Sequence, residues 1–295
     1  MNTSSNAVVA TAPTAVADRR QALRTGCDFA MTAADFDRVR KLIYQHAGIS
    51  LAEGKRTMVY SRLSRRLRET GHTSFGDYLN RLSSLTGPGG DAEWQAFVNC
   101  LTTNLTAFFR EEHHFPVLAA ELTARRHAPL RLWCNAASTG EEPYSLAMTA
   151  LEALGPRPSA SILASDIDTA VLAAAGRGVF DAQAGGLDAP RLRRHFMRGK
   201  GENSGFIRVK PELQALIEFR QFNLMHEHWA LGEPFDIVFC RNVMIYFDNP
   251  TQRRVLERMH RVMKPGGLLF AGHSENFTDA RSLFRLRAKT VYERL

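Results

Sequence analysis

Apolar residues first recur with a helical period between residues 35 and 104. The first segment repeats at every third or fourth position and ends at Gly48, a residue typical of a helix C-terminus. Its apolar positions are Phe36, Val39, Ile43 and Ala47. We therefore predict a small all-α domain over residues 29–104, preceded by a disordered tail over residues 1–28.

Positive charge gathers on one segment of this domain. Residues 55–68 contain six Lys or Arg and no acid. On a helical wheel, Val59, Leu63 and Leu67 share one face. The arginines that point the other way are Arg62, Arg65 and Arg68. We predict a helix with an outward arginine face, and a loop over residues 85–91 (LTGPGGD) before helical spacing resumes.

After residue 130, short apolar or β-branched runs alternate with helical stretches. The expected strands lie near residues 131–134, 161–166, 217–223, 236–242 and 267–272, and helices near 144–154, 170–176 and 251–263. This alternation predicts a second domain over residues 105–295 with a mostly parallel sheet, whose ligands lie at the carboxyl ends of the strands. A glycine-rich turn between two extended runs predicts an inserted antiparallel β sub-domain at about 185–216.

Composition narrows the functional classes only in part. The 295 residues carry a formal net charge of +8, which favours nucleic acid, anionic lipid or an acidic protein surface as a partner. The four cysteines are too scattered for a CxxC pattern, so we expect buried thiols in a reducing compartment. No uncharged apolar run approaches the ~20 residues of a membrane span. The start of the chain lacks the basic region of a signal peptide, so we expect a soluble, cytoplasmic protein.

A tight loop of small residues follows the first predicted strand, in NAASTGEEPYSLAMTALEAL (135–154). A dinucleotide-binding loop here would use several glycines to present amides to a pyrophosphate, but this loop has only Gly140. Glu141 and Glu142 open the helix and would repel a phosphate. The loop therefore favours a cofactor with a cationic amine, such as S-adenosylmethionine. The alternative, that the acids only complement the helix dipole, stays open.

Asp166 ends the second predicted strand, in ILASDID, where a carboxylate accepts both ribose hydroxyls of a bound nucleoside. NAD would satisfy Asp166 equally well, and a helix cap at Asp166 or Asp168 is the alternative. A Pro-Gly-Gly turn that leads into a strand, in KPGGLLFAGHSE, is common in S-adenosylmethionine methyltransferases. Together these features favour that cofactor.

Five phrases, in this order and spacing, resemble the bacterial chemotaxis receptor methyltransferases of the CheR family: TNLTAFFRE, ASTGEEPYS, ASDIDT, FCRNVMIYF and KPGGLLFAGHSENF. The resemblance covers residues 29–295. It implies an α/β fold: a class I, Rossmann-like S-adenosylmethionine-dependent methyltransferase domain with an inserted antiparallel β sub-domain, preceded by a small all-α domain. It also implies methylation of glutamate side chains on the cytoplasmic region of chemoreceptors, with S-adenosylhomocysteine as the product.

The resemblance also implies roles for single residues. The implied cofactor contacts are Asn104, Thr106, Arg110, Glu141, Asp166, Asn223, Leu224, Arg241 and Asn242. The implied catalytic residues beside the transferred methyl are Arg110 and Tyr246. The residues expected to bind the receptor are Arg62, Arg65 and Arg68 on the arginine face and Gly199, Gly201 and Arg208 in the sub-domain. In the family, this sub-domain can hold the C-terminal tail of certain receptors. We expect a monomer that reaches the membrane only through its receptor.

The expected reaction needs no general base. A glutamate side chain has a pKa of about 4.3, so it is already the nucleophile at neutral pH. Alignment of the reacting groups and removal of water from the carboxylate are the main ways to lower the barrier. We expect Arg110 to orient the acid and Tyr246 to supply a hydrogen bond or an aromatic wall beside the sulfonium. Core packing at a strand end is the alternative for Tyr246.

Histidines and a cysteine suggest other chemistry. His113, His114 and His273 invite a metal interpretation, but we expect no metal, because adjacent histidines diverge on a helix and no carboxylate stands at a ligand spacing. Cys240 lies in an apolar run, which favours a buried thiol over the nucleophile of an RNA methyltransferase.

The sequence therefore predicts a protein-glutamate O-methyltransferase. The alternative is an RNA or DNA methyltransferase, which the positive charge favours. The basic helix, however, lacks interleaved aromatic residues for base stacking, and no Asn-Pro-Pro-Tyr type motif is present, so we expect no nucleic-acid partner. A non-catalytic adaptor is disfavoured because it would not need Asn104, Arg110, Asp166 and Tyr246.

Overall fold

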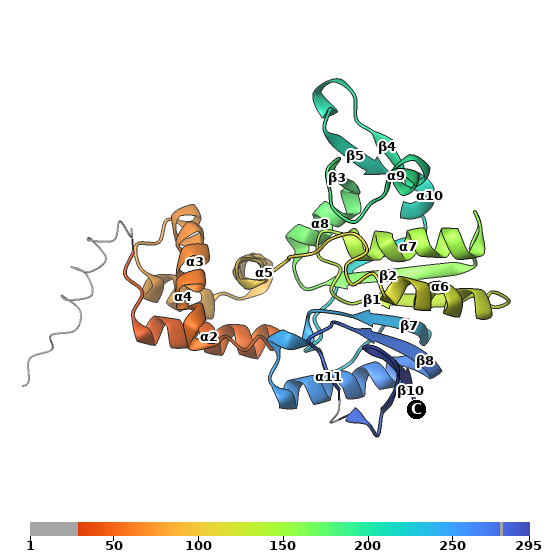
Figure 1. The fold of residues 1–295 in the computed structure, drawn as a ribbon. Coiled ribbons are helices and arrows are strands. Elements are labelled where there is room, and N and C mark those ends of the chain that lie inside the picture. The colour runs from red at the N-terminus through yellow and green to blue at the C-terminus, as the bar shows by residue number, and fades with distance from the viewer. Residues whose placement is uncertain (1–28, 278–279) are drawn as a thin grey trace, which may run out of the picture. The chain divides into compact units, whose positions relative to one another are not determined.

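The computed structural model describes residues 29–277 and 280–295 (Figure 1). The prediction of a disordered tail over residues 1–28 lies outside them. The chain divides into two units, residues 29–42 with Ala52–Leu101, and Ile43–Leu51 with Thr102–Leu295. The division after Leu101 falls close to the domain boundary predicted at residue 104. None of the described helices is long and apolar enough to cross a membrane.

The first unit is helical. Its elements are the start of α2 (Ala33–Ala47), η1 (Glu53–Lys55), α3 (Arg56–Thr70), α4 (Phe75–Ser84) and α5 (Gly87–Leu101). The predicted apolar face of α3 is confirmed, because Val59, Leu63 and Leu67 are fully buried. Gly71 ends α3 in the left-handed conformation that favours glycine.

The loop predicted over residues 85–91 is wrong, because α5 already begins at Gly87. Gly87 has a φ of 71°, which turns the chain into the helix. Pro88 follows in the first turn, where a missing N–H costs nothing. Gly90 packs on Leu85 so closely that an added Cβ would lie 3.0 Å from the Leu85 carbonyl carbon. The turn at Gly87, the proline in the first helical turn and the close packing of Gly90 on Leu85 therefore start a helix where the composition predicted a loop.

The second unit is built on a seven-stranded sheet. In spatial order its strands are β6 (Ile217–Gln221), β2 (Ala160–Asp166), β1 (Leu130–Cys134), β7 (Phe235–Cys240), β8 (Met263–Ala271), β10 (Val291–Arg294) and β9 (Phe284–Ala288). The first five pair in parallel, as predicted, while β10 is antiparallel to β8 and β9. The sequence pattern predicted the five parallel strands and missed β9 and β10.

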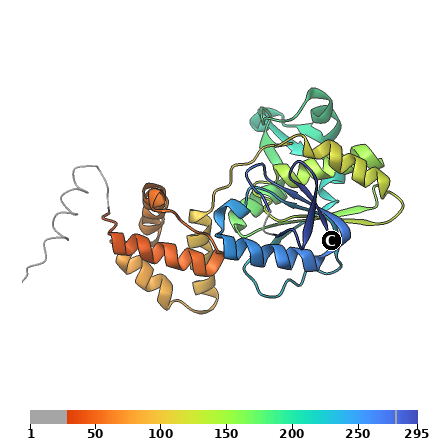
Figure 2. The ribbon, with the colours of Figure 1, turned by 60° about the horizontal axis from the view of Figure 1, so that its bottom comes forward.

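Both faces of this sheet are covered. Figures 1 and 2 show α6 (His114–Ala124) and α7 (Glu141–Leu154) on one face and α11 (Asn249–Val262) on the other. Successive side chains of β7 point to opposite faces of the sheet and pack in both apolar clusters. Ile237 and Phe239 pack in the cluster that contains α6 and α7, whereas Val238 and Cys240 pack in the cluster that contains α11. Cys134 and Cys240 are fully buried thiols, as predicted.

The predicted β sub-domain is present as a separate antiparallel sheet. Its order is β3 (Val179–Asp181), β5 (Phe206–Val209) and β4 (Phe196–Arg198). The short helices α9 (Ala189–His195), η2 (Gly201–Asn203) and α10 (Pro211–Gln214) accompany it. The hairpin of β4 and β5 was predicted, whereas β3 lies upstream of the predicted segment and adds a third strand.

Candidate active site

The strand order reverses between β1 and β7. From β1 the chain runs outward to β2 and β6, and from β7 it runs to β8 in the other direction. At such a point two loops leave the carboxyl ends of neighbouring strands in opposite directions, and ligands bind there. We call the loops that follow β1, β2, β6 and β7 the switch edge. Six of the nine predicted cofactor contacts lie within or next to these loops, and the other three, Asn104, Thr106 and Arg110, precede β1.

The loop after β1 turns sharply into α7 at Gly140. This residue has a φ of 106°, and an added Cβ would lie 3.0 Å from the Cβ of Ala175, so glycine is required. Glu141 begins α7 and is partly exposed, with its carboxylate accepting a hydrogen bond from the Thr139 hydroxyl at 2.6 Å. The loop consists of small residues, of which Ala136 and Thr139 are partly exposed next to the acidic side chain of Glu141.

Asp166 is buried at the end of β2. One carboxylate oxygen accepts from the Ser138 amide at 2.9 Å and the other from the Asp168 amide at 3.0 Å. Burial raises the pKa of Asp166 to about 6, although these backbone hydrogen bonds act in the opposite direction. Asp168, not Asp166, caps α8 (Thr169–Arg177). The cap alternative for Asp166 is therefore wrong, and its oxygens retain acceptor capacity for hydroxyl groups.

Left-handed backbone gathers at the same edge. Of the five non-glycine residues with positive φ in the described chain, four come from the site loops: Phe109, Glu111, Ser138 and Asn242. Such conformations cost about 1–3 kcal/mol each and persist only where the surroundings enforce them, which is typical of functional sites. The fold thus marks this edge independently of any sequence motif.

Arg241 follows β7, and its side chain is fully buried in a charged network. Its guanidinium donates to Glu142 at 2.8 Å and lies 3.4 Å from Glu111, and it also donates to the carbonyl oxygen of Arg110. Burial would raise the pKa of Glu111, but Arg241 together with hydrogen bonds from His273 and Asn242 lowers it to about 2. Burial raises the pKa of Glu142, an effect that Arg241 opposes. The predicted cofactor contact at Arg241 stays a prediction, and its side chain is already used within the protein.

Arg110 differs from Arg241 although the two are in contact. It is partly exposed, and its guanidinium donates to the Leu105 carbonyl oxygen at 2.9 Å. Within residues 29–277 and 280–295 it makes no ion pair with a carboxylate. A guanidinium without a carboxylate at ion-pair distance can donate a charge-assisted hydrogen bond to one oxygen of a substrate carboxylate.

Asn104 and Thr106 lie in the segment that leads to Arg110. The amide group of Asn104 donates to Asp168 at 2.9 Å, and its carbonyl oxygen accepts from the Ser138 hydroxyl at 3.0 Å. Thr106 is partly exposed. These contacts tie the segment before β1 to the loops after β1 and β2, so the structure brings Asn104 next to Asp168 and Ser138.

Asn223 and Leu224 follow β6. The Asn223 amide donates to the His46 carbonyl oxygen at 2.7 Å, its oxygen accepts from the Met225 amide at 2.9 Å, and Leu224 is buried. Asn223 therefore orders its own loop, and its role as a cofactor contact stays a prediction.

Asn242 and Tyr246 follow β7. The Asn242 amide donates to Glu111 at 3.3 Å. Tyr246 does not stand at a strand end as expected but in the 3₁₀ turn η3 (Met244–Tyr246), partly exposed and packed beside the α11 cluster. The predicted catalytic role of Tyr246 and its core-packing alternative are thus compatible with the same position.

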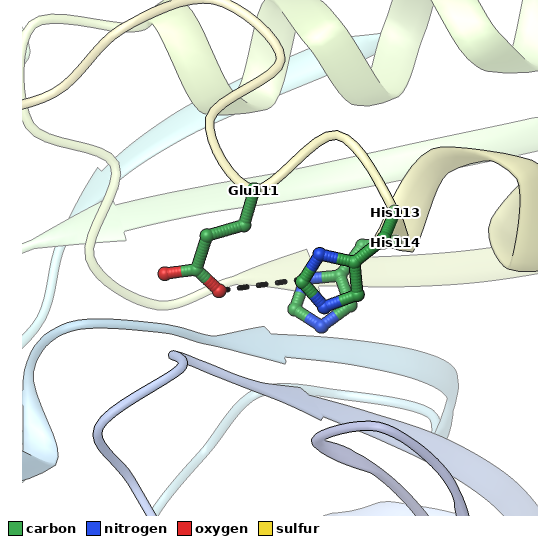
Figure 3. Close-up of side chains that lie close together, drawn as sticks. All are labelled: Glu111, His113 and His114. Atoms are coloured by element: carbon green, nitrogen blue, oxygen red, sulfur yellow. Dashed lines mark ion pairs between the residues drawn. The ribbon is translucent and has the colours of Figure 1, made fainter.

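The argument that the adjacent histidines diverge is wrong. Figure 3 shows His113 and His114 side by side, with ring centroids 4.2 Å apart, next to Glu111. His113 precedes α6 with helical dihedral angles and His114 begins the helix, so the two rings lie together although the backbone is helical there. Ligand atoms of the three residues lie within 4.8 Å of one another. The Arg241 guanidinium, 3.4 Å from the Glu111 oxygen, opposes a second cation in this position. The absence of a metal stays a prediction.

Sequence reasoning assigned no site role to three acidic residues that contact this edge through Arg241 or Asn242: Glu111, Glu142 and Glu275. Each lies within a phrase that carries the family resemblance, and Glu111 and Glu142 directly follow the predicted site residues Arg110 and Glu141. Nothing local distinguishes Glu141, which is partly exposed, from the buried Glu142 beside it. Only the position of Arg241 across the sheet separates their roles.

Receptor-binding residues were predicted on α3. Arg65 and Arg68 are exposed, as expected, whereas Arg62 is partly buried. Arg65 pairs with Glu69 at 3.2 Å, and the Arg68 guanidinium lies 5.9 Å from the centre of the Phe29 ring. The neighbouring Arg66 faces Glu93 instead, and this contact raises its pKa.

The predicted residues of the sub-domain surround its hairpin. Gly199 packs against Asn203, and Gly201 has a φ of 60° at the turn. Arg208 is exposed on β5, opposite Val179 of β3 and Met197 of β4. Arg208 therefore stands on the middle strand and not on an edge. Val179, Met197 and nearby Phe206 are 43–49% exposed, so Arg208 lies within an apolar surface.

Comparison with known proteins identifies this arrangement. A family model described as "CheR methyltransferase, SAM binding domain" matches residues 104–292, and "CheR methyltransferase, all-alpha domain" matches residues 34–102. The chain belongs to the CheR methyltransferase family. It is 54% identical over 269 residues to Chemotaxis protein methyltransferase 2 of Pseudomonas aeruginosa, covering 90% of this chain and 94% of that protein. It is 52% identical to the chemotaxis protein methyltransferase of Escherichia coli, covering 89% and 91%.

The cofactor of this CheR methyltransferase is S-adenosylmethionine, and the switch edge fits it. Asp166 offers a buried carboxylate with remaining acceptor capacity, the loop that turns at Gly140 consists of small residues, and Glu141 supplies an anion at the helix start. Together these groups suit a nucleoside with a cationic amine better than a pyrophosphate. The sequence-based assignment of the cofactor is confirmed.

Proposed function

We propose that this CheR methyltransferase methylates glutamate side chains on the cytoplasmic helical region of chemoreceptors. The observation that carries the proposal is the contrast between two neighbouring arginines. Arg241 is neutralised by Glu142 and Glu111, whereas Arg110 is partly exposed without a carboxylate partner in the described chain. A cation held ready beside an S-adenosylmethionine site suits a carboxylate substrate. The names of the two relatives above support a substrate within chemotaxis.

The residues of the site bind and align the two reactants and transfer no proton. S-adenosylmethionine supplies the methyl group, and Asp166 and Glu141 hold the cofactor. Arg110 binds one oxygen of the substrate carboxylate and leaves the other free to attack, and Tyr246 closes the site beside them. Because a glutamate is ionised at pH 7, no residue has to remove a proton. The rate enhancement then comes from alignment and from the exclusion of water.

The proposal also assigns receptor contacts to two exposed surfaces, the arginine face of α3 and one face of the β sub-domain. Arg65 and Arg68 rest against acidic residues of the receptor helices, with Arg62 beside them. In the sub-domain, the surface formed by Val179, Met197, Phe206 and Arg208 takes a receptor tail that offers an apolar side chain and a carboxylate. A tail on a flexible linker raises the local concentration of the methylation sites up to about the millimolar range, which compensates for weak contacts there.

Transfer of label from S-adenosylmethionine tests which substrate the protein methylates. The protein is incubated with receptor-rich membranes and, separately, with total RNA. We expect base-labile label on a receptor band, because methyl esters are cleaved by base. The Arg110→Met variant should transfer the methyl group to the receptor at least 100-fold more slowly, and its affinity for S-adenosylhomocysteine should change less. Arg126→Met, an exposed arginine after α6, is the matched control. Label in RNA and none on a receptor would contradict the proposal.

Peptide binding tests the sub-domain. Arg208→Glu is expected to abolish binding of a receptor-tail peptide while cofactor affinity and the melting temperature stay unchanged, because Arg208 is exposed. Arg193→Glu, an equal charge reversal on α9, should bind the peptide normally. If wild-type protein binds no tail from the receptors of its own organism, the sub-domain serves only as a cover for the methyltransferase.

A further inference from the structure

Glu275 follows β8 in the phrase GHSENF and is 5% exposed. Its carboxylate accepts hydrogen bonds from four backbone amides. One oxygen accepts from Gly272 at 2.6 Å and Asn242 at 3.0 Å, and the other from Val243 at 3.0 Å and Met244 at 2.8 Å. Two separate segments, after β7 and after β8, therefore meet on one side chain.

The charge of Glu275 rests on backbone dipoles alone. No ion pair in the described residues includes it. Burial raises its pKa, and the four amides act in the opposite direction. A buried anion without a cation is costly unless its lone pairs are used, so the four amide hydrogen bonds hold the Glu275 carboxylate in one place.

The contacts of Glu275 form an interlocked turn. Asn242 has a φ of 57°, and its amide group donates to Glu111 at 3.3 Å. Gly272 leaves no room for a side chain, because an added Cβ would lie 2.6 Å from the Asn242 side-chain nitrogen and 2.9 Å from the Glu275 oxygen. The carboxylate thus fixes Asn242 in an unfavourable conformation and fixes the start of η3, the turn that carries Tyr246.

We propose that Glu275 is a positioning residue for methyl transfer. By holding the amides of Asn242, Val243 and Met244, it sets the places of Asn242 and Tyr246 at the cofactor and substrate. Displacement of such groups by about 1 Å costs roughly 100-fold in rate. The part of this inference that concerns Tyr246 rests on the proposed function, whereas the part that concerns cofactor binding does not require a receptor.

Glu275→Gln tests the inference because it keeps the shape of the side chain but removes its charge and one acceptor oxygen. The matched control is Asp236→Asn at the amino end of β7. Asp236 is also 5% exposed, and it accepts from the Arg131 amide and from Lys264, each at 2.9 Å. Both variants lose folding stability, but only Glu275 contacts the switch edge.

Four quantities are measured for each variant: the free energy of unfolding, the Kd for S-adenosylhomocysteine, and kcat and KM with receptor. We expect Glu275→Gln to bind S-adenosylhomocysteine at least tenfold more weakly and to lower kcat at least tenfold at saturating cofactor, with KM for receptor unchanged. Asp236→Asn should stay within twofold of wild type in Kd, kcat and KM. If Glu275→Gln does not fold, Glu275→Asp, which keeps the charge on a shorter side chain, carries the same comparison.

Glu275 would be purely structural if its variant lost stability as Asp236→Asn does but kept Kd and kcat within twofold of wild type. That result overturns the inference. Failure of the wild-type protein to methylate any receptor would instead overturn the proposed function, and the S-adenosylhomocysteine measurement would still decide whether Glu275 orders the site.

Discussion

The switch edge and the arginine face of α3 use charge in opposite ways. At the switch edge, Arg241 is fully buried and compensated by Glu142 and Glu111. On α3, Arg65 stands 77% exposed with one exposed partner, Glu69. Buried charges interact strongly and define one geometry, whereas exposed charges are screened by water and salt. The first region can therefore fix a reaction site, and the second can guide an acidic partner without fixing it.

The largest expected effect comes from breaking the buried pair. Glu142→Gln leaves Arg241 with only the more distant Glu111, so we expect a loss of about 3 kcal/mol in the free energy of unfolding, measured by urea denaturation. Glu141→Gln, its partly exposed neighbour, should change that free energy by less than about 0.5 kcal/mol. Equal losses in the two variants would contradict the view that burial separates their roles.

Cofactor binding gives the next effect. Asp166→Ala removes two charge-assisted hydrogen bonds, so S-adenosylhomocysteine affinity should fall by about 2–4 kcal/mol, measured by calorimetry. The matched control is Asp188→Ala, which removes the cap of α9 on the sub-domain and should leave affinity unchanged. Unchanged affinity in Asp166→Ala would mean that the site is misplaced.

The raised pKa of Asp166 gives a pH dependence with a defined sign. Because burial raises this pKa to about 6, the carboxylate is mostly ionised at pH 7 and becomes protonated as the pH falls through 6. If only the ionised form accepts both hydroxyls, S-adenosylhomocysteine affinity weakens toward tenfold per pH unit below 6. The stability of the free protein moves the other way, since protonation relieves a buried charge. Asp166→Asn should flatten the affinity profile between pH 5 and 7, and an unchanged profile would assign the titration to another group.

The smallest effect concerns α3. Reversal of Arg65 and Arg68 to Glu should raise the receptor KM several-fold at low salt, and the difference should shrink toward none at high salt. Cofactor affinity should not change. Arg81→Glu, an exposed arginine on α4, is the control. Normal receptor kinetics of the double variant at low salt would show that the arginine face is only solvated surface.

The sequence by itself determined the features that depend on local pattern. The period of apolar residues gave the buried face of α3, and the alternation of runs gave five parallel strands and the inserted hairpin. The order of motifs gave the family and its cofactor, because the loop at Gly140 and the acid at the end of β2 each combine a backbone geometry with a side chain at fixed spacing. Short elements with few apolar residues, such as β3, gave too weak a pattern to be recognised.

Only the tertiary structure decided which charges are available. Glu141 and Glu142, like Arg110 and Arg241, are chemically equal in the sequence, and they differ because α7 and β7 bring Glu142 and Arg241 together in the interior. The rings of His113 and His114 lie 4.2 Å apart, and Glu275 accepts hydrogen bonds from four amides of two loops. The Glu142–Arg241 pair joins residues 99 positions apart, and a one-dimensional pattern carries no information on such contacts. The free energy of a charge depends on what surrounds it, so its role is settled only when the chain is folded.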